Sequence, residues 1–158
     1  MPKYRLLTDE ELIHFDEDFK QFLIVNQIYA TEWLTMNQED PQKAIEIVSL
    51  FSDQIMQRVY EKIAYVEKRE VNSCFVFHFK ADQLELIALQ LKESAPDNVS
   101  LLTVASVHDA MLNHPNLIEY FRHHKAYKNT REEELHQLFE QGAELSSSEF
   151  WESLEKAL

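Results

Sequence analysis

Residues 63–92 read IAYVEKREVNSCFVFHFKADQLELIALQLK, and this stretch decides the fold. Apolar and polar side chains alternate along it with the period of two that is typical of β-strands. Its central part, residues 73–80, is apolar on both alternating faces, which indicates a strand in the middle of a sheet. Together with residues 98–105 (NVSLLTVA), the pattern predicts four strands, at residues 63–68, 73–80, 84–92 and 98–105. The links between them are short, so we expect antiparallel neighbours in a meander.

Helices are predicted on the N-terminal side of these strands, over residues 1–60. Thr8 followed by Glu11 is the pattern of a capping box, which begins a helix. Pro41 directly after Asp40 suits the first position of a longer helix that reaches about Tyr60. Apolar side chains recur in this region at helical spacing, which supports the assignment.

Residues 106–158 are also predicted to be helical. One helix should end at His114, because Pro115 disfavours helical geometry in the residue before it. A second helix is predicted through residues 117–121, and a third that ends at Gly142. A final helix is expected after a capping box at Ser146. The chain is therefore expected to form a single α+β domain, with helices in residues 1–60, a four-stranded antiparallel meander in residues 61–105 and helices in residues 106–158.

Composition excludes several classes of function. The net charge of −13 opposes binding to nucleic acid or to anionic membranes. The chain has one glycine, Gly142, which excludes the glycine-rich loops that hold nucleotide phosphates. Its one cysteine, Cys74, excludes an internal disulfide and any zinc site built on two thiolates of one chain. No secretory signal or membrane-length apolar run is present, so we expect a cytoplasmic protein without a cofactor.

Two Glu-x-x-His pairs could in principle serve a metal, at Glu11 and His14 and at Glu133 and His136. Di-iron bundles use such pairs with both side chains pointing inward. Here the helical phase places the histidines away from the apolar stripe, so no metal site is predicted. Cys74 and His78 share a strand face, but four residues separate them by about 13 Å, too far for a catalytic dyad.

A basic block interrupts the acidic chain at residues 122–131. It contains Arg122, His123, His124, Lys125, Lys128 and Arg131, and no acid. The block holds four of the 15 Lys and Arg side chains of the chain. The rest of the chain has 11 basic and 28 acidic side chains, which is a net charge of −17. One interpretation is a solvated helix end, where cations favour the negative pole of the helix dipole. The other is a docking site for an anion or an acidic partner.

Two stretches show resemblances. Residues 19–55, FKQFLIVNQIYATEWLTMNQEDPQKAIEIVSLFSDQI, resemble a family of uncharacterised bacterial proteins, a domain of unknown function. That resemblance implies a bacterial cytoplasmic protein with no assigned activity. Residues 133–158, EELHQLFEQGAELSSSEFWESLEKAL, are similar to a short helical hairpin at the C-terminus of many bacterial proteins. This second resemblance implies a role in oligomerisation.

Two functional hypotheses follow. The first is a non-enzymatic protein–protein interaction or small regulatory or adaptor protein, with a protein partner or self-association, and no catalytic, cofactor or metal residue. The alternative is a ligand-binding protein or an enzyme with a pocket between sheet and helices. Its candidate polar groups are His78, Asp53 and the basic block.

Overall fold

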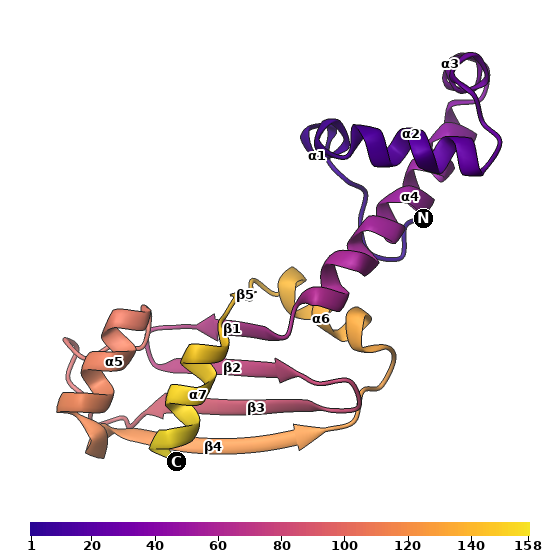
Figure 1. Cartoon of the computed structure of the whole chain (residues 1–158). Coiled ribbons are helices and arrows are strands. Elements are labelled where there is room, and N and C mark those ends of the chain that lie inside the picture. Colours follow the sequence, from indigo (N-terminus) through magenta and orange to yellow (C-terminus); the bar gives the residue numbers. More distant parts are fainter. The chain divides into compact units, whose positions relative to one another are not determined.

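The computed structural model describes residues 1–158, which form seven α-helices, one 3₁₀ turn and five strands (Figure 1). The chain divides into two compact units, residues 1–60 and residues 61–158, each with its own packing. The α+β class, with helices at both ends of an antiparallel sheet, is confirmed. The single domain stays a prediction, and the two units are described separately below.

The N-terminal unit is helical, as predicted. Its helices are α1 (Asp9–His14), α2 (Asp16–Val25), α3 (Ala30–Glu39) and α4 (Pro41–Lys62), whose last two residues lie beyond the unit. The capping box of Thr8 and Glu11 is present: the Glu11 N–H donates to Thr8 Oγ1, and the Thr8 N–H donates to Glu11 Oε1. The Lys43 N–H likewise donates to Asp40 Oδ1, 3.2 Å away, at the start of α4. Local capping chemistry therefore begins both helices where the sequence predicted.

Aromatic rings hold this unit together. The Phe51 ring of α4 is buried, and the rings of Phe19 and Phe22 from α2 lie 5.0 and 5.4 Å from it. Trp33 of α3 meets Phe19 edge-on at 5.2 Å. Ring contacts of this kind stabilise beyond the area that they bury. They fix α2, α3 and α4 against one another.

The second unit is built on one antiparallel sheet. Its strands are β1 (Tyr65–Arg69), β2 (Ser73–Phe79), β3 (Leu84–Leu91), β4 (Ile118–Lys125) and β5 (Glu144–Leu145). Their order is β4-β3-β2-β1-β5, so β1 to β4 follow one another as a meander. The first three predicted strands are confirmed. Its helices are α5 (Val104–Asn113), α6 (Arg131–Glu140) and α7 (Ser148–Ala157).

The fourth predicted strand is wrong. Residues 98–105 belong to no strand. Val99 and Leu101 are buried in the core, and Thr103 caps α5 through a capping box with Ser106.

The helix predicted through residues 117–121 is also wrong. The 3₁₀ turn η1 (Pro115–Leu117) redirects the chain into β4, which pairs with β3 along eight residues. The cap of α7 lies one residue later than predicted, at Ser147.

Helices α5 and α7 cover one face of the sheet (Figure 1), and α6 covers part of the other. Cys74, Val76, Ile87 and Leu89 point to the face of α5 and α7 and join Trp151 in the buried core. The opposite face carries a row of apolar side chains across the three adjoining strands, formed by Phe75, Phe77, Leu86, Ala88 and Phe121. Antiparallel sheets with one open face usually turn polar side chains outward. Helix α6 accounts for part of this apolar face, because Val66, Phe79 and Leu84 on the same face are buried and Arg131 of α6 lies over the Phe79 ring. Phe75, Phe77 and Leu86 are only half-buried, and Phe121 is 41% exposed. No helix in the structure is long and apolar enough to cross a membrane.

Candidate functional site

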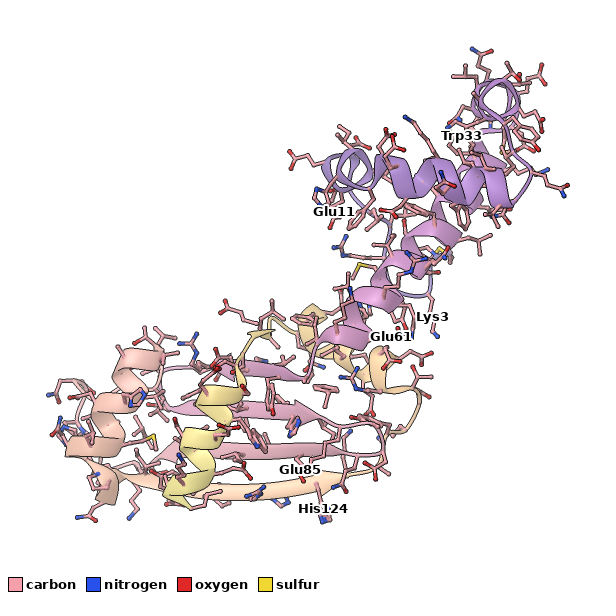
Figure 2. The ribbon with its side chains drawn as sticks, in the orientation of Figure 1. Lys3, Glu11, Trp33, Glu61, Glu85 and His124 are labelled. Atoms are coloured by element: carbon pink, nitrogen blue, oxygen red, sulfur yellow. The ribbon has the colours of Figure 1, made fainter.

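Four polar or aromatic side chains form a line across the sheet. Tyr65 of β1 is the register partner of His78 of β2, which pairs with Glu85 of β3, which pairs with His124 of β4. Figure 2 labels Glu85 and His124, which lie side by side on adjacent strands. Directly opposite residues in antiparallel strands point to the same face. The fold thus brings together residues that lie almost sixty positions apart in sequence, on the face that α7 covers.

Stacked rings and one cation hold this line in place. The His78 ring stacks on Tyr65 at 4.4 Å and meets Trp151 of α7 edge-on at 5.4 Å. The Arg122 guanidinium lies over the Trp151 ring at 5.8 Å, and its Nη2 is 2.7 Å from Glu155 Oε2. His78 Nδ1 is buried without a hydrogen-bond partner. The orientation of the imidazole is therefore set by the packing of its ring against Tyr65 and Trp151, since no hydrogen bond is made at Nδ1.

Burial and the neighbouring charges together set the protonation of the His78 imidazole. Burial lowers the pKa of His78, and the Lys80 charge lowers that pKa further, so the neutral imidazole is favoured. Lys80 donates to Glu85 Oε1 at 2.9 Å, which lowers the pKa of Glu85.

A shallow cavity of about 260 Å³ adjoins Glu85 and is lined by Glu85, Arg122, His123 and His124. Of the residues proposed from the sequence, Arg122, His123 and His124 line this cavity, whereas His78 lies beside Glu85 on β2 and does not line it.

The basic block lies mostly in a strand and not at a helix end, so the helix-end interpretation is wrong. Successive residues of β4 alternate between the two faces. Arg122 and His124 point toward the α7 side, and His123 and Lys125 point to the open face. Lys125 Nζ lies 2.7 Å from Glu134 Oε1 of α6. The helices on either side of the strand thus supply carboxylates to its cations.

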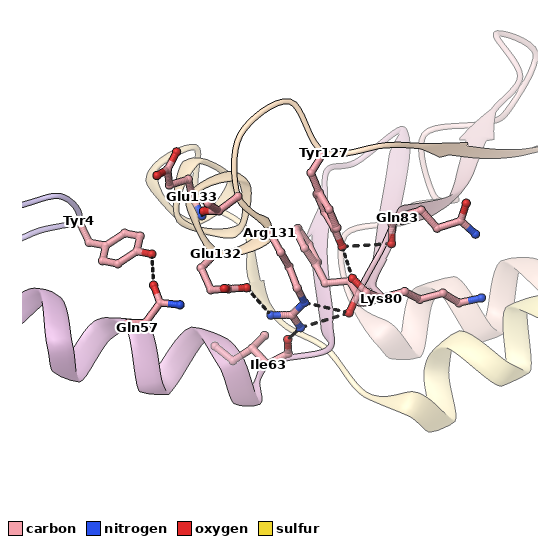
Figure 3. A network of polar contacts seen from close by, with 11 residues as sticks. Tyr4, Gln57, Ile63, Lys80, Gln83, Tyr127, Arg131, Glu132 and Glu133 are labelled. Carbon is pink, nitrogen blue, oxygen red and sulfur yellow. Dashed lines mark hydrogen bonds and ion pairs between the residues drawn. The ribbon is translucent and has the colours of Figure 1, made fainter.

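The remaining cations of the block lie after β4. Lys128 is exposed in the loop before α6. Arg131 is the first residue of α6, and it donates to the Phe79 carbonyl at 3.1 Å and to the Ile63 carbonyl (Figure 3). Its Nη1 also lies 3.2 Å from Glu132 Oε2. Arg131 therefore joins α6 to the ends of β1 and β2, which is a structural role.

The other residues singled out in the sequence have structural surroundings. Cys74 is fully buried, and burial raises the pKa of its thiol to about 12. Asp53 accepts hydrogen bonds from the N–H groups of Lys3 and Tyr4 at 2.7 and 2.9 Å. Both therefore stabilise the unit in which they lie. Docking of an anion or acidic partner at residues 122–131 stays a prediction.

Members of the Glu-x-x-His pairs contact residues close to them in the sequence. Glu11 accepts two hydrogen bonds from Arg5, at 2.7 and 2.9 Å, which lower the pKa of Glu11 to about 2. His136 Nε2 lies 3.6 Å from Glu140 Oε1. The structure contains no group of three or more His, Cys, Asp or Glu side chains that could hold a metal ion.

An apolar groove that the sequence did not predict lies between α2 and α3. The groove has a volume of about 510 Å³ and is lined by Asp16, Phe19, Lys20, Leu23, Ile24, Ile28, Tyr29, Ala30, Trp33 and Leu34. Ile24, Tyr29 and Leu34 are 51, 55 and 63% exposed. The run of apolar residues from Phe22 to Val25 could have indicated this surface. Four successive apolar side chains spread around the helix, so they cannot all lie in the one apolar stripe that faces the core.

The turn between α2 and α3 shapes this groove. The N–H of Ile28 donates to the Leu23 carbonyl at 2.8 Å and that of Gln27 donates to the Ile24 carbonyl at 2.9 Å, the pattern of a Schellman motif. Gln27 takes the left-handed position, with φ of 61°. Ile28 and Leu23 both line the groove, so the cap that ends α2 also sets its floor.

Comparison with known proteins places the chain in a family. Searches of curated proteins and of solved structures gave no match. A family model described as a family of unknown function (DUF6495) matches residues 1–158. The expected resemblance to a domain of unknown function is thereby confirmed, while the likeness of residues 133–158 to a C-terminal hairpin stays a prediction. The chain belongs to this family of unknown function, DUF6495, over its whole length.

Proposed function

We propose that the protein is a cytoplasmic, non-enzymatic interaction protein, an adaptor or small regulatory subunit, whose α2–α3 groove receives an amphipathic helix of a partner protein. The observation that carries the proposal is the groove, with its three large apolar side chains more than half exposed. Contiguous exposed apolar surface on a globular protein marks interaction sites. A helix that presents apolar side chains at positions i, i+3, i+4 and i+7 is the usual occupant of such a groove.

The chemistry of the groove favours anchoring over catalysis. Its lining is carbon-rich, with only Asp16 and Lys20 contributing charge. Its volume of about 510 Å³ suits a few Leu-sized or Phe-sized anchors from a partner helix. Trp33 and Tyr29 supply rigid, amphipathic contact area, the residue types that dominate binding energy in interfaces. The groove thus has the composition of a helix-binding surface.

Charge around the groove specifies the flanks of the partner. The two helices carry five acidic side chains and one basic one: Asp16, Glu17, Asp18, Glu32 and Glu39 against Lys20. Lys20 Nζ lies 3.1 Å from Asp16 Oδ2 and 3.6 Å from Glu17 Oε1, so its charge is already offset. The surface is therefore acidic. A partner helix with Lys or Arg beside its apolar face fits best, whereas anionic lipid is repelled.

A peptide titration tests this proposal. Two fluorescent peptides of about 18 residues share Leu at i, i+3, i+4 and i+7, and differ only in Lys or Glu at the other positions. The full-length protein should bind the Lys peptide with a Kd on the order of micromolar and the Glu peptide at least tenfold more weakly. Fluorescence anisotropy gives both values.

Matched variants locate the binding. Leu34→Glu puts a charge in the groove and should abolish binding, while Ile13→Glu, at a 76% exposed position outside it, should leave the affinity unchanged. Equal binding by both variants would show that the Lys peptide responds only to overall charge. That result, or no binding by the unmodified protein, would overturn the proposal.

A further inference from the structure

The sheet of the second unit has one long open edge. At one side, β5 is two residues long, whereas β4 at the other side extends over eight residues, of which the last five are exposed. An exposed edge strand offers unpaired backbone groups to another chain. We propose that two copies of this chain pair through antiparallel β4 strands, with Phe121 on the two-fold axis. This inference is independent of the proposed helix groove.

The hydrogen-bond pattern shows which backbone groups are available. The Lys92 N–H donates to the Leu117 carbonyl at 2.8 Å, one step beyond the pairing of Leu91 with Ile118. Inward and outward backbone groups alternate along an antiparallel strand. Because residue 117 points toward β3, the N–H and C=O groups of Tyr120, Arg122 and His124 point away from it. These groups form a regular outer edge that a second strand can join.

One register places complementary side chains opposite each other. When Phe121 lies opposite Phe121 of the second copy, the outward N–H and C=O groups of Tyr120 in one copy lie opposite those of Arg122 in the other. In the same register Glu119 lies opposite His123. Phe121 is 41% exposed and lies on the open apolar face, so pairing would cover the ring and join the apolar faces of the two sheets. Aromatic pairs directly across two strands stabilise antiparallel pairing.

Charge favours this edge over other surfaces. Two chains of net charge −13 repel each other, and the basic block is where the chain departs from that charge. In the antiparallel arrangement the basic half of β4, residues 122–125, faces residues 117–120 of the other copy, so the two basic halves do not meet. Arg122 and Lys125 are moreover paired with Glu155 and Glu134 of their own chain, which limits repulsion.

Site-specific cross-linking tests the register. Cys74 is fully buried, so a cysteine introduced on β4 would be the only accessible thiol of the chain. Phe121→Cys should form a disulfide dimer under mild oxidation, because residues on the axis bring their Cα atoms within about 4.5–5.5 Å. Glu119→Cys is the control, since its two copies would lie about 13 Å apart along the strands. Equal or absent cross-linking of both variants would overturn the register.

The oligomeric state of the full chain tests the interface itself. Sedimentation equilibrium from about 1 to 200 µM should show a dimer that Phe121→Glu dissociates. Leu145→Glu, 64% exposed on the same face at the other edge, should leave the dimer intact. His124→Pro, which removes an outward N–H, should weaken the dimer at least tenfold more than His124→Ala. A monomer at all concentrations, or a dimer indifferent to Phe121→Glu, would overturn the proposal, whereas binding of the Lys peptide should survive this variant.

Discussion

Gln27 and Gly142 hold the same place in two copies of one capping motif. Each is the left-handed residue after a helix, with φ of 61° after α2 and 94° after α6. In both motifs the next residue donates across the turn, Ile28 to the Leu23 carbonyl and Ala143 to the Leu138 carbonyl. Glycine takes this conformation without steric cost, whereas other residues are strained there. The one glycine of the chain therefore occupies the left-handed position after α6, whereas a glutamine occupies the equivalent position between α2 and α3.

Exchanging the residue types should shift stability in opposite directions. Gln27→Gly should stabilise the N-terminal unit by about 0.5–1 kcal/mol, because relief of left-handed strain exceeds the added chain entropy. Gly142→Ala should destabilise the second unit by about 1 kcal/mol, since a Cβ there has no atom within 4 Å and only the backbone is strained. Urea denaturation, followed by circular dichroism, measures both. Shifts of the same sign would contradict the assignment.

The sequence predicted the elements whose signals are local. The capping box at Thr8, the start of α4 at Pro41 and the first three strands are confirmed because each depends on neighbouring residues alone. Residues 118–125 were assigned wrongly because IEYFRHHK has apolar positions compatible with either period. Pairing with β3 decided between them. Tertiary contacts commonly override propensity in this way.

The candidate site was less predictable than the fold. The sequence indicates His78, Arg122 and His124 as polar groups of interest, but their place on one face of the sheet depends on the register of two strand pairs, β2 with β3 and β3 with β4. Carboxylate partners such as Glu155 and Glu134 come from helices whose positions only the fold defines. The α2–α3 groove is a surface formed by the angle between two helices. No local pattern encodes such an angle.

Arg131 should be a structural residue and not a docking residue. Arg131→Ala should destabilise the second unit by about 2 kcal/mol, because the Phe79 and Ile63 carbonyls lose their donor. Arg131→Lys should recover little, since a single ammonium lacks the fork that reaches two carbonyls. Lys128→Ala, at an exposed loop position, is the control and should change stability by less than about 0.5 kcal/mol. Urea denaturation monitored by tryptophan fluorescence distinguishes these outcomes, in a Trp33→Phe background that leaves Trp151 as the one tryptophan.

Glu11 should titrate well below an ordinary glutamate. The hydrogen bonds from Arg5 and from the Thr8 N–H lower the pKa of its carboxyl from 4.5 to about 2. Because the folded pKa lies below the unfolded one, the stabilisation is present above pH 4.5 and is lost as pH falls toward 2. Carbon-detected NMR titration of the carboxyl group measures the value directly. A midpoint near 4.5 would show that the Arg5 pair does not persist in solution.

Glu11→Gln should remove this acid dependence and cost about 1 kcal/mol at neutral pH, the usual worth of a helix cap. Glu10→Gln is the matched control, because Glu10 neighbours it on the same helix and is exposed. Comparing urea midpoints at pH 7 and pH 3 isolates the contribution of Glu11. Identical behaviour of the two variants would count against the capping role.

Cys74 should make the second unit sensitive to alkali. Burial holds the thiol protonated in the folded state and raises its pKa from 9.0 to about 12, whereas the unfolded chain releases the proton near pH 9. The unfolded state therefore gains relative stability between those two values as pH rises. By pH 9.5 the loss from Cys74 should reach about 0.8 kcal/mol. Above that pH the tyrosines, whose ordinary pKa is about 10, add to the loss, because burial also raises the pKa of Tyr127 to about 12. Cys74→Ala should be less stable at pH 7, because it leaves a small cavity, but its stability should fall much less than that of the unmodified protein between pH 8 and 9.5.

Thiol labelling gives a second measurement of the same burial. At pH 8 an aromatic disulfide reagent should leave the folded protein unlabelled and react fully after unfolding in urea, since a fully buried thiol reacts only when its surroundings open. The labelling rate in intermediate urea then follows the opening of the β2–β3 core specifically. A destabilised variant such as Arg131→Ala should label faster, and Lys128→Ala should not. Rapid labelling of the native protein would contradict the packing of Cys74 between the sheet and its helices.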